Sequence, residues 1–268
     1  MRNDSLKEKY STKMSDKDYF SIDAVSNSSF RLLQQSPIHY ENRKLFDLQS
    51  DSINLGSAVH KLVLEPDDFY DEYAVESFEG CELNKNSKAY KEAKAQWLES
   101  VADKVVLNSD KFAQVETMAR NVKAIAGGMF DGGSAEIAFI SEIDDIKVKC
   151  KADYYFEDAG VVVDLKTTAS IKEFERKSFV EYGYITQAPF YMDVITSLRL
   201  KATTFVFVVV ESTKPYNVAV YETGERSLEV GRALYKKHLY SYKEYKSSGI
   251  FNLVKTLEAP EWFLEQNY

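Results

Sequence analysis

The sequence has 268 residues, of which 44% are hydrophobic and 13% aromatic, so it can bury one large core, and this composition argues against a disordered chain. Its formal net charge of −8 argues against broad electrostatic attraction to a phosphate backbone, so any nucleic-acid surface has to be local. The two cysteines, Cys81 and Cys150, are too few for a disulfide framework, a four-cysteine zinc site or an iron-sulfur cluster. We interpret them as structural thiols.

The first 18 residues are polar and charged, and they lack the apolar stretch that a secretory signal or a membrane span requires. We therefore expect a cytoplasmic protein with no membrane partner. Residues 19–268 are expected to form a single domain, because the prolines and glycines are too scattered to mark a long linker. Within it, residues 19–130 should be mainly helical, and residues 131–268 should hold a sheet and a C-terminal helix.

Helix signals come first along the chain. A polar cluster at residues 26–29 precedes an apolar run and predicts a short helix that closes at residues 36–37. Apolar residues recur at helical spacing over residues 55–63 and predict a second helix. This helix would carry Gly56 and His60 on one side, because they are four residues apart.

The pattern over residues 84–126 predicts two charged helices, which end at the glycine pairs of residues 127–133. Beyond them the period changes to that of strands. The predicted elements are a three-stranded meander at 135–140, 146–156 and 160–166, a helix at about 181–198, strands at 203–211 and 216–221, and a helix at 227–247. Together they predict an α/β fold with a mixed central sheet flanked by helices and an N-terminal helical elaboration.

Charged side chains gather on the predicted hairpin. Alternation along the strand places four of them on one face: Lys147, Lys149, Lys151 and Asp153. In the next strand Asp164 and Lys166 share a face, and either two-residue closure of the turn brings Asp153 opposite one of them. Two acids and a lysine on an apolar hairpin are costly to bury unless they bind something, and a divalent cation with oxygen ligands is the natural candidate.

Asp153 followed by Asp164-Leu165-Lys166 resembles the motif of the PD-(D/E)XK nucleases. The wider pattern is similar to the RecB/RecE branch, which has a Gly-x-x-x-His helix, an acidic strand, the Asp and Asp-x-Lys motifs and a Gln-x-x-x-Tyr helix. The matching residues here are Gly56 with His60, Glu136, Asp153, Asp164 with Lys166, and Gln187 with Tyr191. The segment at residues 26–37 is similar to the opening of RecE-like phage and prophage exonucleases.

The resemblance implies a restriction-endonuclease-like core and a site for Mg²⁺ or Mn²⁺. Asp153, Asp164 and the backbone carbonyl of Leu165 would be metal ligands, and Lys166 would orient or help to deprotonate the attacking water. The resemblance gives the remaining residues supporting roles: His60 and Glu136 as further metal ligands, Gln187 and Tyr191 as residues that position the lysine or the DNA, and Lys147, Lys149 and Lys151 as the lining of a DNA groove.

The resemblance to RecE-like enzymes further implies an ATP-independent exonuclease that degrades one strand of linear duplex DNA in the 5′ to 3′ direction. Relatives form ring-shaped homo-oligomers and supply single strands to a RecT-like annealing protein. Two other functions stay open on the same fold. One is a catalytically silent DNA-binding or recombination-partner module, and the other is a site-specific endonuclease.

Each candidate residue also has an ordinary structural interpretation. The three lysines could form a solvated strand face, and His60 could be a core histidine. Glu136 could be an exposed edge acid, and Gln187 with Tyr191 could be ordinary helix packing. The acid-acid-lysine set itself could be an ion pair between neighbouring strands.

Overall fold

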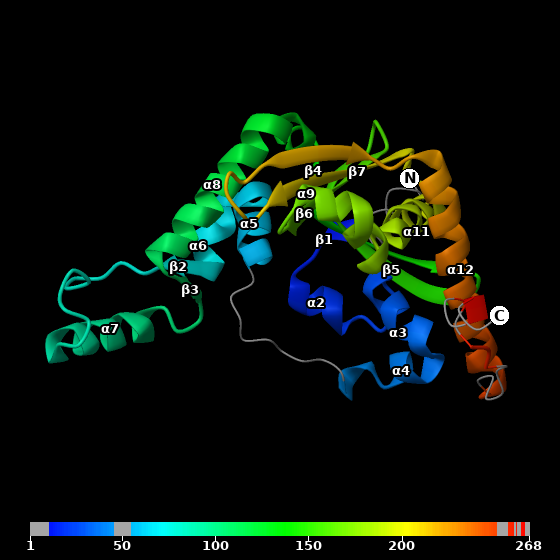
Figure 1. The fold of residues 1–268 in the computed structure, drawn as a ribbon, viewed down its shortest axis with the longest axis horizontal. Coiled ribbons are helices and arrows are strands. Elements are labelled where there is room, and N and C mark those ends of the chain that lie inside the picture. Colours follow the sequence, from blue (N-terminus) through cyan, green and yellow to red (C-terminus); the bar gives the residue numbers. More distant parts are fainter. Residues whose placement is uncertain (1–10, 46–54, 251–256, 260, 262–263, 266–268) are drawn as a thin grey trace, which may run out of the picture.

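The computed structural model describes residues 11–45, 55–250, 257–259, 261 and 264–265. A six-stranded mixed sheet forms the centre of the fold, in the order β1-β4-β5-β6-β7-β8 (Figure 1). Its strands are β1 (Ser11–Lys13), β4 (Ser134–Ile143), β5 (Ile146–Phe156), β6 (Val161–Thr168), β7 (Thr204–Glu211) and β8 (Val218–Glu222). Neighbouring strands are antiparallel, except that β6 and β7 are parallel, and such a pair needs a long crossover connection, which here contains a helix.

Helices cover both faces of this sheet. The α-helices of the described chain are α2 (Asp16–Ser21), α3 (Phe30–Gln35), α4 (Pro37–Glu41), α5 (Leu55–Leu64), α6 (Phe69–Glu72), α7 (Lys88–Ser100), α8 (Ser109–Ala126), α9 (Ile171–Glu173), α10 (Phe179–Glu181), α11 (Tyr184–Ser197) and α12 (Glu225–Ser248). The helices α3, α11 and α12 pack on one side, and α5 and α8 pack on the other. The predicted α/β fold with a mixed sheet flanked by helices is confirmed.

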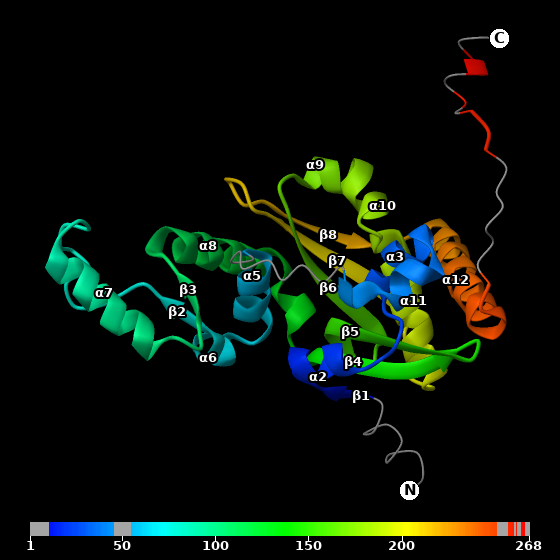
Figure 2. The same cartoon turned by 90° about the horizontal axis from the view of Figure 1, so that it is seen from below.

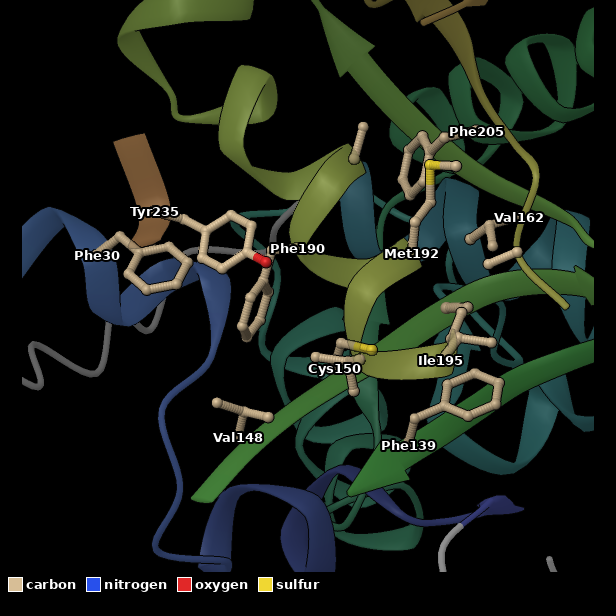
Figure 3. Packing of buried hydrophobic residues seen from close by; sticks show 14 of the residues in the cluster. Phe30, Phe139, Val148, Cys150, Val162, Phe190, Met192, Ile195, Phe205 and Tyr235 are labelled. Carbon is tan, nitrogen blue, oxygen red and sulfur yellow. The ribbon is translucent and has the colours of Figure 1, made fainter. Parts of the chain in front are cut away.

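Two hydrophobic cores lie on opposite faces of the sheet, and β7 contributes to both. Phe205 and Phe207 belong to the core beneath α11, whereas Val206 and Val208 belong to the core beneath α8. This burial on both faces is what the unbroken apolar run of this strand predicts. Figure 3 shows the first core, in which Cys150 is buried as a structural thiol should be, whereas Cys81 is exposed and does not fit that interpretation.

The side chains of β5 change from one core to the other partway along the strand. Ala152 packs in the core beneath α11, but Tyr154, two residues later, packs in the core beneath α8. Regular alternation would put both side chains on one face. Glu136 in β4, the residue that faces Asp153 in the register, has a left-handed φ of 56°. The irregular backbone at this point reverses which face of the sheet the side chains of β4 and β5 point to. Glu136 and Asp153, two of the candidate acids, lie at this point.

The packing of α12 against α11 depends on two residues without ordinary backbone properties. Pro189 lies inside α11 and has no N–H, so the carbonyl of Ile185 has no helical donor. Gly231 of α12 approaches that carbonyl so closely that an added Cβ would lie 1.9 Å from its oxygen. The two helices therefore meet backbone to backbone.

The N-terminal part of the described chain belongs to the sheet. Strand β1 pairs with β4, although it falls within the 18 residues that the sequence treats as a polar segment. On the other side, β2 (Tyr73–Val75) and β3 (Val105–Leu107) form a small parallel sheet, and α7 extends from it away from the central sheet (Figure 2). Among the described helices, none is both long and apolar enough to cross a membrane.

Candidate active site

The β5–β6 hairpin brings the two candidate aspartates together. Its ladder ends at the pair Tyr154–Val163, which places Asp153 level with Asp164, one of the two registers that the turn permits. Beyond this pair the strands diverge, and the Asp153 carboxylate accepts a hydrogen bond of 2.7 Å from the N–H of Leu165. A side chain therefore replaces the backbone acceptor at the point where the ladder stops.

Asp164 is the most deeply buried acid of the site, with only 1% of its surface exposed. The Gln187 amide donates a hydrogen bond of 2.5 Å to Oδ2, and the Lys166 ammonium forms an ion pair with Oδ1. Among the described residues no donor other than Lys166 reaches this buried oxygen, so a positive charge is what balances it. A carboxylate oxygen in such a position is suited to a cation.

Lys166 is held by charge and by an aromatic ring. Burial opposes its charge, but the carboxylates of Asp164 and Asp153 outweigh burial and raise the pKa of Lys166, so it is an ammonium ion. Its Nζ atom lies 4.9 Å from the centre of the Tyr184 ring, within the range of a cation–π interaction. In this arrangement the lysine is therefore a charged hydrogen-bond donor.

His60 comes from α5 and reaches the two strands from the opposite side. Its Nδ1 lies 3.4 Å from the Asp153 carboxylate, and a hydrogen bond to the backbone of Leu165 holds the ring. Burial, followed by the positive charge of Lys166, lowers the pKa of His60 to about 4. The ring is therefore neutral at neutral pH, which is the form that binds metal ions.

Burial lowers the pKa of His60 but raises the pKa of the two aspartates. It raises the pKa of Asp153 to about 7 and the pKa of Asp164 to about 6, although Lys166 favours the charged form of both. Two carboxyl groups that are costly to ionise side by side would gain from a bound divalent cation.

Glu136 lies at the edge of the site and is paired with a lysine. Its carboxylate is 2.5 Å from Nζ of Lys151, and Lys151 also pairs with Asp16 at the start of α2. The two acids outweigh burial and raise the pKa of Lys151. Lys151 thus joins the N-terminal segment to the acids of the site.

The three predicted groove lysines do not form an open cationic face. Lys147 is exposed, but Lys149 is 5% exposed and donates hydrogen bonds to the carbonyls of Tyr19 (2.7 Å) and Ile22 (2.8 Å). Lys149 does not face an open groove in this arrangement, because α2 lies over it and its donors bind backbone carbonyls. Lys151 faces the site, where it forms ion pairs with Asp16 and Glu136.

Gln187 and Tyr191 lie one turn apart on α11, as their spacing predicts. Gln187 reaches Asp164, whereas Tyr191 packs edge-on against Phe205, with ring centres 5.9 Å apart. Burial raises the pKa of Tyr191 well above its usual range, so its phenol stays neutral. Of the pair, Gln187 is the residue that directly orients a candidate ligand.

A cleft of about 820 Å³ opens onto these residues. Five of the predicted site residues line it: His60, Glu136, Lys151, Asp153 and Lys166. Most of the other lining residues were not singled out from the sequence, and among them are Asp16, Thr167 and Tyr184. Asp164 lies behind Lys166. For Tyr184 a signal existed, because it precedes Gln187 by three residues and so shares its helix face.

The donor atoms fit a hard divalent cation in kind, since carboxylates, a backbone carbonyl and a neutral imidazole are available. Within the described residues, however, no three acidic, histidine or cysteine side chains are already grouped as a metal site. Two of the candidate acids already form ion pairs with lysines. Asp164 is paired with Lys166, and Glu136 is paired with Lys151.

Comparison with known proteins gives a family and a fold. A family model described as a PDDEXK-like domain of unknown function (DUF3799) matches residues 26–250. The crystal structure of a protein from Eubacterium rectale described as a "putative exonuclease" has a TM-score of 0.59 at 15% identity, over 95% of this chain and 98% of that chain. At this identity the likeness shows a shared fold alone.

A second crystal structure, of the protein SSO0001, has a TM-score of 0.40 at 15% identity, over 90% of this chain and 86% of that chain, and this likeness is too low to carry an argument. No curated protein matches the sequence.

Proposed function

The chain belongs to the family of PDDEXK-like domains of unknown function, and from this premise we propose that it is a metal-dependent nuclease that hydrolyses DNA phosphodiesters. The observation that carries the proposal is the cluster of Asp153, Asp164 and Lys166, in which Asp153 and Lys166 line one cleft and Asp164 is buried directly behind Lys166. A structural ion pair between strands would need neither the cleft nor the neutral imidazole of His60 beside it.

Asp153, Asp164 and the carbonyl of Leu165 would hold Mg²⁺ or Mn²⁺, with His60 and Glu136 as further ligands. Bound there, the ion would supply a Lewis acid for the phosphate and would lower the pKa of a bound water. PDDEXK nucleases typically use such a divalent metal, and the oxygen-rich donor set agrees with it.

The protein's own groups would then orient the reactants. Lys166 would donate a hydrogen bond from its ammonium to the attacking water or to a phosphate oxygen, and so would offset negative charge in the transition state. Gln187 and the N–H of Leu165 each hold one aspartate, so both acids keep their orientation while substrate enters.

Within this proposal, the substrate is the end of linear duplex DNA, and one strand is degraded in the 5′ to 3′ direction without ATP. The RecE-like motif order and the description of the Eubacterium rectale structure support the exonuclease form. The same resemblance supports a ring-shaped homo-oligomer and a RecT-like single-strand annealing partner. Lys147, which is exposed on β5, is then a candidate contact to the DNA backbone.

The test uses linear duplex, labelled separately at each 5′ and 3′ end, and a closed circular plasmid, each with Mg²⁺ or with EDTA. Release of nucleotides from linear DNA alone, only with Mg²⁺, supports the proposal, and the first label lost gives the polarity. Cutting of the circle would indicate an endonuclease. A gel shift without products from either substrate would indicate a silent binding module and would overturn the proposal. Asp164→Ala serves as the matched control for contaminating nucleases.

A further inference from the structure

The turn between α10 and α11 is fixed by a small hydrogen-bond cluster. Gly183 adopts a left-handed φ of 74° at the start of α11, and its carbonyl accepts a hydrogen bond of 3.2 Å from the Asn27 amide. The Thr186 hydroxyl lies 2.8 Å from both this carbonyl and the Asn27 oxygen, and it can donate to either. One asparagine therefore joins the N-terminal part of the chain to the turn before the Gln187 helix.

Asn27 is free to make this contact because its neighbours supply the local cap. Ser26 and Ser29 form a reciprocal capping box around the 3₁₀ turn Asn27–Ser29, which directly precedes α3. The Asn27 side chain is therefore not needed as a cap. This gives a role to the serine-rich segment at residues 26–29, which the proposed chemistry leaves without one.

The residue that follows the turn is Tyr184. Its ring stacks on Phe174, with centres 5.5 Å apart and planes 26° apart, and it lies 5.9 Å from the ring of Phe207. The Lys166 ammonium lies 4.9 Å from the centre of the Tyr184 ring, and both residues line the cleft. The ring is thus held from behind and presented to the lysine.

We propose that Tyr184 is a positioning residue that keeps the Lys166 ammonium at the cleft, and that Asn27 acts through Tyr184 by fixing the Gly183 turn. The inference rests on the proposed nuclease function. A lysine side chain has four rotatable bonds, and its ion pair with Asp164 weakens whenever another cation shares that carboxylate. The face of Tyr184 attracts the ammonium without a formal charge, so it does not compete for such a cation.

Substitution at Tyr184 separates the aromatic face from the hydroxyl. Tyr184→Leu should lower kcat about 10-fold, as expected for the loss of a partly desolvated cation–π contact, with little change in KM for DNA. Tyr184→Phe keeps the ring and should stay within about 2-fold of the wild type. Tyr240→Leu, at an exposed tyrosine of α12, is the matched control. If the Phe variant loses as much as the Leu variant, the aromatic face is not what matters.

A double-mutant cycle tests the part of Asn27. Asn27→Ala alone should lower kcat about 3-fold, and it should cause no further loss in the Tyr184→Leu protein, because both changes interrupt the same contact. Independent losses that multiply would mean that Asn27 serves only the fold.

An NMR readout separates failure of this inference from failure of the nuclease proposal. The Cε protons of Lys166, assigned by loss of their signal in Lys166→Arg, should be shifted upfield by the ring current of Tyr184. The shift should persist in Tyr184→Phe and vanish in Tyr184→Leu, without DNA or metal. An unshifted signal in a wild-type enzyme that cleaves DNA overturns this inference alone, whereas a shifted signal in a protein without Mg²⁺-dependent cleavage overturns only the proposed function.

Discussion

Two lysines of the central sheet, Lys149 on β5 and Lys166 on β6, are both shielded from solvent but have opposite surroundings. Lys149 meets backbone carbonyls and the Tyr19 ring, and burial lowers its pKa. Lys166 meets two carboxylates that raise its pKa, and it borders an open cleft. The partner therefore distinguishes them, since carbonyls make a lysine part of the scaffold, whereas carboxylates beside a cleft make it part of a candidate site.

The largest expected difference comes from removing each amine in turn. Lys166→Ala should lower cleavage by about 1,000-fold or more, because the ammonium that faces the transition-state charge is lost. Duplex binding by the folded variant should remain measurable in a gel-shift assay. Wild-type rates in this variant would remove Lys166 from the mechanism.

The next test concerns the acid behind Lys166. Asp164→Ala should abolish cleavage and weaken Mn²⁺ binding by more than the roughly 10- to 100-fold that loss of an outer partner causes. Titration calorimetry measures the affinity. Gln187→Ala is the milder companion, since Gln187 only orients Asp164, and its effect should fall within that range. Unchanged Mn²⁺ affinity in the Asp164 variant would contradict its role as a ligand.

Lys149→Met should show the reverse pattern. Loss of the ammonium removes the Lys149 hydrogen bonds to the carbonyls of Ile22 and Tyr19, of which Tyr19 keeps the N–H of Ile22 as a donor, so the free energy of unfolding should fall by about 1–3 kcal/mol. The kcat of the folded enzyme should stay within about 3-fold of the wild type, because Lys149 touches neither aspartate. Denaturant unfolding gives the first quantity. A large loss of kcat without loss of stability would erase the contrast between the two lysines.

The smallest expected effect is a dependence of metal stabilisation on pH. The folded-state pKa of Asp153 is raised to about 7, so its neutral form stabilises the metal-free protein, and this contribution is lost as pH rises through 7. The lowered pKa of His60 opposes this only below about pH 6.5. Mg²⁺ should therefore raise the unfolding midpoint more at pH 8 than at pH 5.5, because it binds the ionised carboxylates.

Asp153→Asn is the control for that measurement. It removes the titrating carboxyl group while keeping its size, so the difference between the two pH values should shrink. An equal effect of Mg²⁺ at both pH values in the wild type would show that the ion binds elsewhere.

The part of the site that could be predicted is the part fixed by local alternation. Asp164 and Lys166 share a face of β6 because a strand has a period of two, and the turn limits Asp153 to two registers. The position of Lys149 depends on α2, whose carbonyls come from 127 and 130 residues earlier in the sequence. No local pattern contains that contact.

Other features escaped prediction because they depend on tertiary context. A short polar strand such as β1 has no apolar pattern of its own, and it becomes a strand by pairing with β4. The left-handed backbone of Glu136 gives no signal in a residue type that rarely adopts it. Strict alternation consequently assigns Tyr154 to the wrong core.

The backbone contact at Gly231 fixes the position of α12 against α11, the helix that carries Gln187. An added Cβ at position 231 would lie 1.9 Å from the carbonyl oxygen of Ile185, so only a residue without a side chain allows α12 to approach α11 this closely. Ile185 lies two residues before Gln187, so the contact with α12 helps to set the direction in which the Gln187 amide points at Asp164. A single methyl group added at position 231 would therefore displace α11 and change the position of Gln187 relative to Asp164.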